Sequence, residues 1–131
     1  MQSFTIETGS KEAFLDITAQ VAECVRTANV ASGICTVHVP HTTAGGTINE
    51  NADPDVTRDM LWALNRFVPE GGGYHHREGN SPAHVKASLM GSTVTVPIDE
   101  GRLVLGTWQG IYLCEFDGSR RRRVLVQIIG G

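Results

Sequence analysis

Histidine is the side chain best suited to metal binding and proton transfer near neutral pH. Three of the five histidines of this chain lie in one short segment, Tyr74 to His84. Within it, His76 and His84 can converge on one ion, because imidazole nitrogen is a good ligand for zinc and other divalent transition metals. Their spacing matches no standard metal motif, so a pair of structural histidines is the alternative. His75 should point away from His76, and we leave it out of the metal shell.

A third imidazole, His41, lies in an unusually polar segment from Pro40 to Asn51. If His41 joins His76 and His84, the site has three nitrogen ligands and an open position, as catalytic zinc sites do. We therefore predict a centre with these three histidines as metal ligands and zinc as the ion, with magnesium as the alternative for a diphosphate substrate. His38 should face the other side of its strand and is interpreted as structural.

Carboxylates beside such a centre could move protons. Glu50 and Glu78 are candidates for the general base or for a group that orients an imidazole, and His41 is a third candidate for acid–base catalysis. The neighbouring side chains that we expect to contact a substrate are Thr42, Asn49 and Asn51. A polar surface turn is the alternative interpretation of this whole segment.

Two further stretches could hold a substrate. Trp108 could form a pocket wall against a flat ring, with Gln109 bonding to the edge of that ring, but plain core packing of Trp108 is equally consistent with the sequence. The only basic run extends from Arg120 to Arg123. It is interpretable as a nucleic-acid patch, as a solvated edge or intersubunit contact, or as a phosphate site to which Arg122 contributes.

Composition limits the classes of protein to which the chain can belong. Its 131 residues are 40% hydrophobic, which fits one compact domain over residues 1–131. The formal charge of -3 gives no footprint for nucleic acid or for an anionic membrane. There is no signal-peptide pattern and no apolar run of about 18 residues, so we expect a cytoplasmic protein without a membrane partner. The three cysteines lack metal or disulfide spacing and should be buried thiols.

The elements that must position these residues alternate between strand and helix patterns. Strands are predicted over residues 3–8, 14–17, 34–39, 47–51, 93–96, 102–105, 108–116 and 122–129, and helices over 19–28, 54–67 and 83–90. Thr18 and Asp53 are the predicted N-caps of the first two helices. Segment 47–51 is expected to pair with 34–39, and the last two strands to form a hairpin. This pattern predicts an α+β sandwich or closed sheet of mixed or antiparallel strands with two or three helices.

The motifs in their order along the chain resemble those of the YjbQ family, formerly an uncharacterised protein family. The stretches that carry the resemblance are His41–Ala44, Asn49–Pro54, Tyr74–Gly79, Ala83–Lys86, Gly91 and Gly106–Gly110, and it covers essentially the whole chain. The resemblance implies a two-layer β-sandwich with helices, assembly as a homotrimer, and a polar cleft where His41, His76 and His84 meet. Gly46 stands where the family has a bulkier apolar residue.

The resemblance also implies a function. It implies a weak thiamine-phosphate synthase activity, which would join hydroxymethylpyrimidine diphosphate to thiazole phosphate and release pyrophosphate, so the expected ligand is a small phosphorylated molecule. A shell of three histidines suits zinc or nickel better than magnesium, which prefers oxygen ligands. The two alternatives are a metal-dependent hydrolase of unknown substrate and a non-catalytic trimeric ligand-binding protein.

Overall fold

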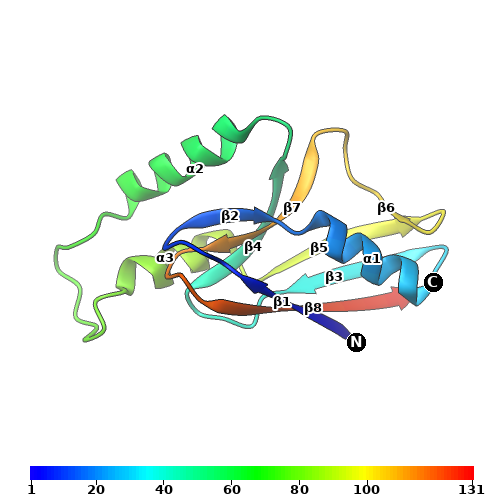
Figure 1. Cartoon of the computed structure of the whole chain (residues 1–131), viewed down its shortest axis with the longest axis horizontal. Coiled ribbons are helices and arrows are strands. Elements are labelled where there is room, and N and C mark those ends of the chain that lie inside the picture. Colours follow the sequence, from blue (N-terminus) through cyan, green and yellow to red (C-terminus); the bar gives the residue numbers. More distant parts are fainter.

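The fold is an α+β two-layer sandwich, as the sequence predicts (Figure 1). The computed structural model describes residues 1–131. In chain order the elements are β1 (Gln2–Glu7), β2 (Ala13–Asp16), α1 (Thr18–Ala28), β3 (Gly33–His38), β4 (Ala44–Glu50), α2 (Pro54–Phe67), α3 (Ser81–Met90), β5 (Thr93–Asp99), β6 (Arg102–Leu103), β7 (Gln109–Glu115) and β8 (Arg121–Gly130). The strands form a five-stranded antiparallel sheet of order β1-β8-β3-β5-β6 and a three-stranded one of order β2-β7-β4.

The main core lies between the two sheets and α1. Val21 and Val25 on α1 are spaced four residues apart, one turn of helix, and both are buried against the sheets. From the three-stranded sheet, Ile111 and Leu113 of β7 enter the same core. The β-branched residues of β3, β5 and β8 complete it from the five-stranded sheet, which is why these segments form strands.

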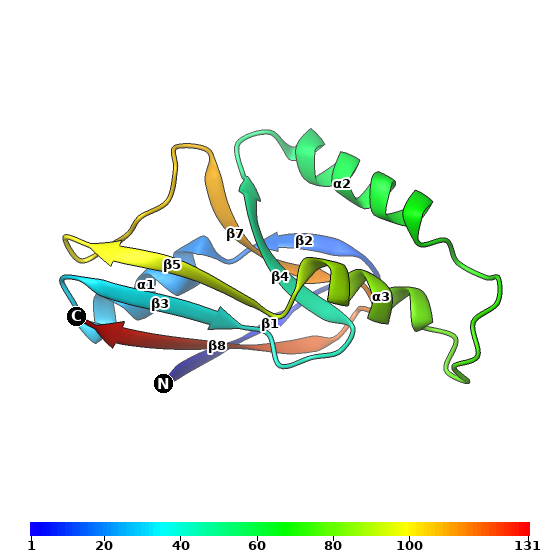
Figure 2. The same cartoon turned by 180° about the vertical axis from the view of Figure 1, so that it is seen from behind.

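Strand β7 also contributes to a second core. Its alternate residues Tyr112 and Cys114 point to the opposite face, where they pack with Leu64 of α2 and with Ala83 and Ala87 of α3. Helix α3 therefore lies against the outer face of the three-stranded sheet, whereas α2 contacts this core through Leu64 and otherwise projects away from the sheet (Figure 2). Because both faces of β7 are buried, this strand is the structural centre of the molecule.

The five-stranded sheet has one face that no helix covers. We call the middle of this face the open sheet face and define it by uncharged outward residues of four strands: Ser3 and Thr5 of β1, Ile34, Thr36 and His38 of β3, Thr93, Thr95 and Pro97 of β5, and Leu125, Gln127 and Ile129 of β8. Ile34 and Ile129 are partners in register and are 49% and 64% exposed. The charged outward residues of the same strands lie at the strand ends: Glu7 of β1, Asp99 of β5, and Arg121 and Arg123 of β8.

The predicted caps had different outcomes. Asp53 caps α2, and its Oδ1 accepts the Asp55 N–H at 2.9 Å, as predicted. The prediction for Thr18 was wrong. Thr18 is the first residue of α1, and its hydroxyl donates to Asp16 and accepts the backbone N–H of Ile111, so it connects α1 to β2 and β7.

Two predicted strand pairings were also wrong. Segment β4 pairs with β7 and not with β3, whose neighbours are β5 and β8. Strands β7 and β8 form no hairpin, because they belong to different sheets and the turn between them crosses from one layer to the other. The cysteine prediction is confirmed, since Cys24, Cys35 and Cys114 are all buried and free. None of the helices is both long enough and apolar enough to cross a membrane.

Candidate functional site: a histidine-lined cleft

A polar cleft of about 430 Å³ opens where the β3–β4 turn, the loop before α3 and the start of β8 meet. It contains no hydrophobic residue. Its lining consists of Pro40, His41, Thr42, Thr43, His76, Glu78, Asn80, His84, Arg120 and Arg122. The three histidines predicted to act together thus line one cleft, although they come from segments up to 43 residues apart in the chain (84 − 41).

His76 and His84 form the closest imidazole pair in this cleft. Their ring centres are 5.4 Å apart and the ring planes are nearly perpendicular, at 86°. Pro82 fixes the start of α3, so that His84 lies on its first turn opposite the loop that carries His76. Two imidazoles on one tetrahedral zinc ion would have ring centres about 5 Å apart, so the pair fits a metal site. No three His, Cys, Asp or Glu side chains converge closely enough to form a complete shell.

His41 lies on the β8 side of the cleft. Strand β3 ends at His38, which is paired with Leu125, so the Arg123 N–H has no partner on β3. That N–H donates instead to Nε2 of His41 at 2.9 Å. Burial lowers the pKa of His41 below its usual 6.5, and the positive charge of Arg122 lowers it further. His41 is therefore held neutral, with Nδ1 as the nitrogen that makes no bond within the protein.

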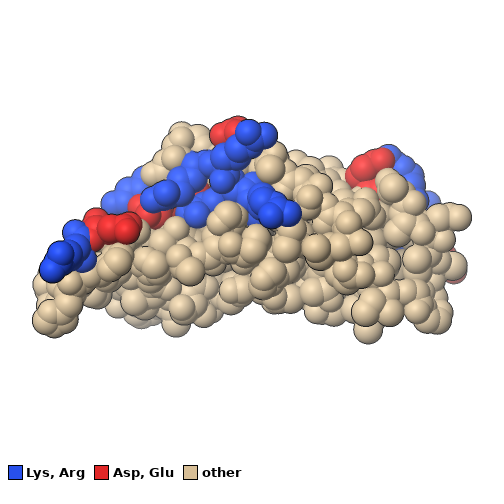
Figure 3. Space-filling view, turned by 90° about the horizontal axis from the view of Figure 1, so that it is seen from below, with Lys and Arg blue, Asp and Glu red and all other residues tan.

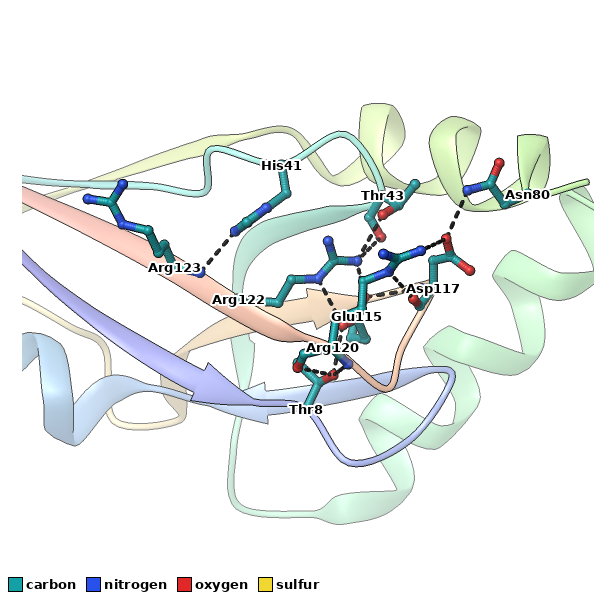
Figure 4. Close-up of polar contacts among 9 residues, drawn as sticks. All are labelled: Thr8, His41, Thr43, Asn80, Glu115, Asp117, Arg120, Arg122 and Arg123. Atoms are coloured by element: carbon teal, nitrogen blue, oxygen red, sulfur yellow. Dashed lines mark hydrogen bonds and ion pairs between the residues drawn. The ribbon is translucent and has the colours of Figure 1, made fainter. Parts of the chain in front are cut away.

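A buried ion pair supports the floor of the cleft (Figure 4). The side chains of Arg122 and Glu115 are 5% and 0% exposed, and the Nε of Arg122 donates to Oε1 of Glu115 at 2.9 Å. The Nη2 of Arg122 also donates to the hydroxyl of Thr43 at 2.8 Å. Thr8 and the Asp117 N–H complete the carboxylate's hydrogen bonds. Arg122 therefore holds the turn that carries His41, and only its Nη1 has no partner within the protein.

Asn80 adds an unpaired acceptor to the cleft wall. Its Nδ2 donates to Oδ2 of Asp117 at 2.8 Å, and that carboxylate also binds Arg120 at 3.0 Å. The Oδ1 of Asn80 is buried and has no hydrogen-bond partner. A buried acceptor without a partner costs about 1–3 kcal/mol.

The remaining predicted site residues lie elsewhere. Asn49 and Glu50 are at the far end of β4, and this seven-residue strand spans about 20 Å. There Glu50 pairs in register with Gln109, and the Asn51 N–H donates to the carbonyl of Trp108 at 3.0 Å. The structure thus brings the two sequence motifs together, but away from the histidines. The single site predicted from the sequence is divided into two groups of residues.

Sequence reasoning missed the polar residues beneath the cleft. Glu115 is the last residue of β7 and Asp117 lies in the turn after it, so in the sequence they resemble an ordinary strand end and turn. Asn80 was treated as part of a loop. The one available signal was the Arg120–Arg123 run. Because side chains alternate along a strand, every second arginine of this run points to the inner face, where a buried arginine needs an acidic partner.

Comparison with known sequences identifies the family. Residues 2–131 match the family described as "UPF0047 protein YjbQ-like". The chain belongs to the YjbQ family. A UPF0047 protein of Methanocaldococcus jannaschii is 47% identical over 127 residues, which cover 97% of this chain and 92% of that protein. YugU of Bacillus subtilis is 44% identical over 131 residues and 99% of both chains.

Solved structures of YjbQ-family proteins have the same fold. A YjbQ/UPF0047 protein of Clostridium acetobutylicum has a TM-score of 0.97 and 53% identity, with 98% of this chain and 100% of that chain covered. A protein of Sulfolobus solfataricus has a TM-score of 0.95 at 33% identity, with coverage of 99% and 96%. These matches confirm the predicted YjbQ-like fold.

The predicted thiamine-phosphate synthase activity is corrected by the same comparisons. The Clostridium protein is described as uncharacterised and the Sulfolobus protein as of unknown function, while the curated relatives bear only the family designation. The residues present also form no complete three-ligand metal cluster. A synthase function therefore has no support from this family or from the geometry of this chain.

Proposed function

We propose that the cleft binds a divalent transition metal ion, zinc in the first place, through His76 and His84, with His41 as the third ligand. The observation that carries this proposal is the 5.4 Å separation of the His76 and His84 rings within a cleft that has no hydrophobic lining. Nitrogen ligands favour zinc over magnesium. His41 can join as the third ligand only if its Nε2 exchanges the Arg123 N–H for the ion, because Nδ1 carries the proton of the neutral ring.

The proposed ligand of this site is a small molecule with an anionic group such as a phosphate. Arg120 and Arg122 line the cleft, and each retains donor groups that the protein does not use. A bound metal ion would supply a Lewis acid for an oxygen of this ligand.

An enzymatic role is the finer part of this proposal. Glu78 lines the cleft, is exposed, and forms no ion pair within the chain. It is therefore the carboxylate best placed to accept a proton from a bound molecule. A cytoplasmic location, expected from the sequence, belongs to the same proposal.

We also propose self-association of the chain, for which the resemblance implies a homotrimer. Its support is the open sheet face, where Ile34 and Ile129 leave an exposed apolar pair. Burial of this face against another copy would cover apolar area that a monomer leaves in water.

Metal content tests the central part of the proposal. We expect the purified protein, after exposure to zinc and gel filtration, to retain about one zinc per chain in elemental analysis. The variants His76→Ala and His84→Ala should each lose this zinc. The matched control is His75→Ala, which removes the neighbouring exposed imidazole and should leave the zinc content unchanged. Equal zinc contents in all four proteins, or no zinc in the wild type, would refute the proposal.

A further inference from the structure

The predicted site residues at the far end of β4 do not line the histidine cleft, so the proposed function gives them no role. We call this region the acidic end and define it by Asp16, Glu50, Asp53 and Asp55, at the ends of β2 and β4 and the start of α2. The end is held together by hydrogen bonds, since Nδ2 of Asn51 donates to Oδ2 of Asp16 at 3.2 Å. These four acids line none of the five principal cavities of the chain. The acidic end thus lies outside these cavities.

The acidic end has charge that its own chain does not neutralise. Glu50 and Asp53 form no ion pair, and Asp55 has only the exposed pair with Arg58 at 3.3 Å. Trp108 lies beside them and is 63% exposed. A large exposed aromatic residue next to unpaired charges is typical of an interface anchor that a partner buries.

Complementary charge lies where the histidine cleft meets the open sheet face. Arg121 and Arg123 are exposed on β8, next to the Arg122 that lines the cleft. Arg123 forms no ion pair, and Arg121 has only a 3.5 Å contact with the exposed Glu7. Figure 3 shows most of the charged side chains of this face, Lys and Arg together with some Asp and Glu, gathered on the half of the molecule that holds α2, α3 and the start of β8. The other half of that face has one smaller cluster that contains both acidic and basic side chains.

We propose that the acidic end of one copy docks at the histidine cleft of a second copy, so that Glu50 and Trp108 of the neighbour complete the site. This inference rests on the proposed function of the cleft. It names a second copy of the chain as the partner that covers Arg121 and Arg123 beside the cleft. Within one chain the two groups are separated by the length of β4, about 20 Å, so only another copy can bring Glu50 to His41. The contact joins two different surfaces and is heterologous, which closes into a ring when the rotation between copies allows it.

Cysteine cross-linking tests this contact without any metal or substrate. The native cysteines are all buried, so new surface cysteines react selectively. Thr42→Cys marks the cleft, and Asn49→Cys marks the acidic end while leaving Glu50 intact; both positions are exposed. We expect a mixture of the two single variants, treated with a bismaleimide much shorter than β4, to give a covalent dimer on a denaturing gel. As the control, a mixture of Thr42→Cys with Glu23→Cys, whose side chain is exposed on α1, should give no covalent dimer.

Charge reversal supplies a second readout. Glu50→Lys should reduce the yield of the Thr42–Asn49 cross-link severalfold, and adding Arg123→Glu to the Thr42→Cys partner should restore it. A yield equal to that of the Glu23 control would overturn the inference, as would a monomeric wild type in sedimentation. Because the cross-link forms without metal, its failure is distinguishable from a failure of zinc binding.

Discussion

The buried pair of Arg122 and Glu115 determines the shape of the cleft at the residue scale. Two nearly inaccessible charges are stable there because each has several hydrogen bonds, including those of Arg122 to Thr43 and of Thr8 to Glu115. The pair connects β7 and β8, which lie in different sheets. The position of the turn that carries His41 therefore depends on an interaction that contributes nothing to metal ligation.

Removal of one partner of this pair should be costly. Arg122→Met leaves the Glu115 carboxylate buried without its counter-ion, and we expect a loss of about 3–5 kcal/mol in the free energy of unfolding, measured with urea. The double variant Arg122→Met/Glu115→Leu should recover much of this loss, because no charge remains buried. A loss below about 1 kcal/mol for Arg122→Met would contradict the buried pair.

The same pair makes stability depend on pH. Burial raises the pKa of Glu115, but hydrogen bonds from Arg122, Thr8 and the Asp117 N–H outweigh it and hold the pKa below the usual 4.5. A carboxyl with a lowered native pKa adds stability that is full above about pH 4.5 and is lost as the pH falls through the native value. Between pH 6 and pH 3 the free energy of unfolding, measured by thermal unfolding, should therefore fall more steeply with decreasing pH in the wild type than in the double variant. The difference in slope should be up to about 1.4 kcal/mol per pH unit. Parallel profiles would contradict this assignment.

The residue types in the sequence predicted the three histidines of the cleft, but not the buried charged residues that support it. His41, His76 and His84 could be grouped from the sequence because imidazoles in polar, glycine-rich loops are unusual. Glu115 and Lys86 could not be recognised, because both residue types are usually exposed and only the three-dimensional structure shows them to be buried.

Helix α2 depends on a buried lysine at the element scale. Lys86 of α3 is 1% exposed, and its Nζ donates to Glu12 at 2.8 Å and to the side-chain oxygen of Asn65 on α2. The only buried residue of α2 is Leu64. Since α2 leads into the loop that carries His76, Lys86 links the packing of α2 to the cleft.

Loss of this lysine should release α2. We expect Lys86→Met to destabilise the protein by about 3–5 kcal/mol, because Glu12 and Asn65 lose a buried partner, and to accelerate amide hydrogen exchange in residues 54–67. Lys11→Met is the matched control. It removes a 3.4 Å ion pair with Glu70 whose side chains are 62% and 55% exposed, so it should change stability by at most about 1 kcal/mol. Unchanged exchange in Lys86→Met would show that the hydrophobic contacts alone hold α2.

Two adjacent glycines of β4, Gly45 and Gly46, differ in the space that is available for a side chain. A Cβ at Gly45 would lie 2.7 Å from the carbonyl oxygen of Gly91, whereas a Cβ at Gly46 would meet its nearest atom, on Val39, at 3.5 Å. Gly45→Ala should therefore lower the free energy of unfolding by about 1–3 kcal/mol. Gly46→Ala should change it by less than about 1 kcal/mol and in the stabilising direction. Equal effects of the two substitutions in urea unfolding would contradict the close approach of β4 to α3.

Most elements were predictable from the sequence, but their partners were not. The helix 54–67 and the eight strands follow from capping, from β-branched residues and from alternation. Those signals are local and carry no information about which sheet a strand enters. A short turn between two strands usually forms a hairpin, but β7 pairs with β2 along one edge and with β4 along the other, which leaves no edge free for β8.

At the scale of the whole molecule, the two cores share β7 and leave the open sheet face without a cover. The histidine cleft lies at the border between this face and the helices α2 and α3. The acidic end lies at the other end of the three-stranded sheet. This separation could not be predicted from the order of motifs, because β4 places residues close in sequence at opposite ends of one strand.

The position of a bound metal ion tests the central claim most directly. Crystals soaked in zinc should show one dominant anomalous-scattering peak at the zinc absorption edge, within coordination distance of both His76 and His84. The absence of a peak in the cleft at saturating zinc, or a dominant peak at His75 or His38 instead, would contradict the assignment of this cleft as a metal centre.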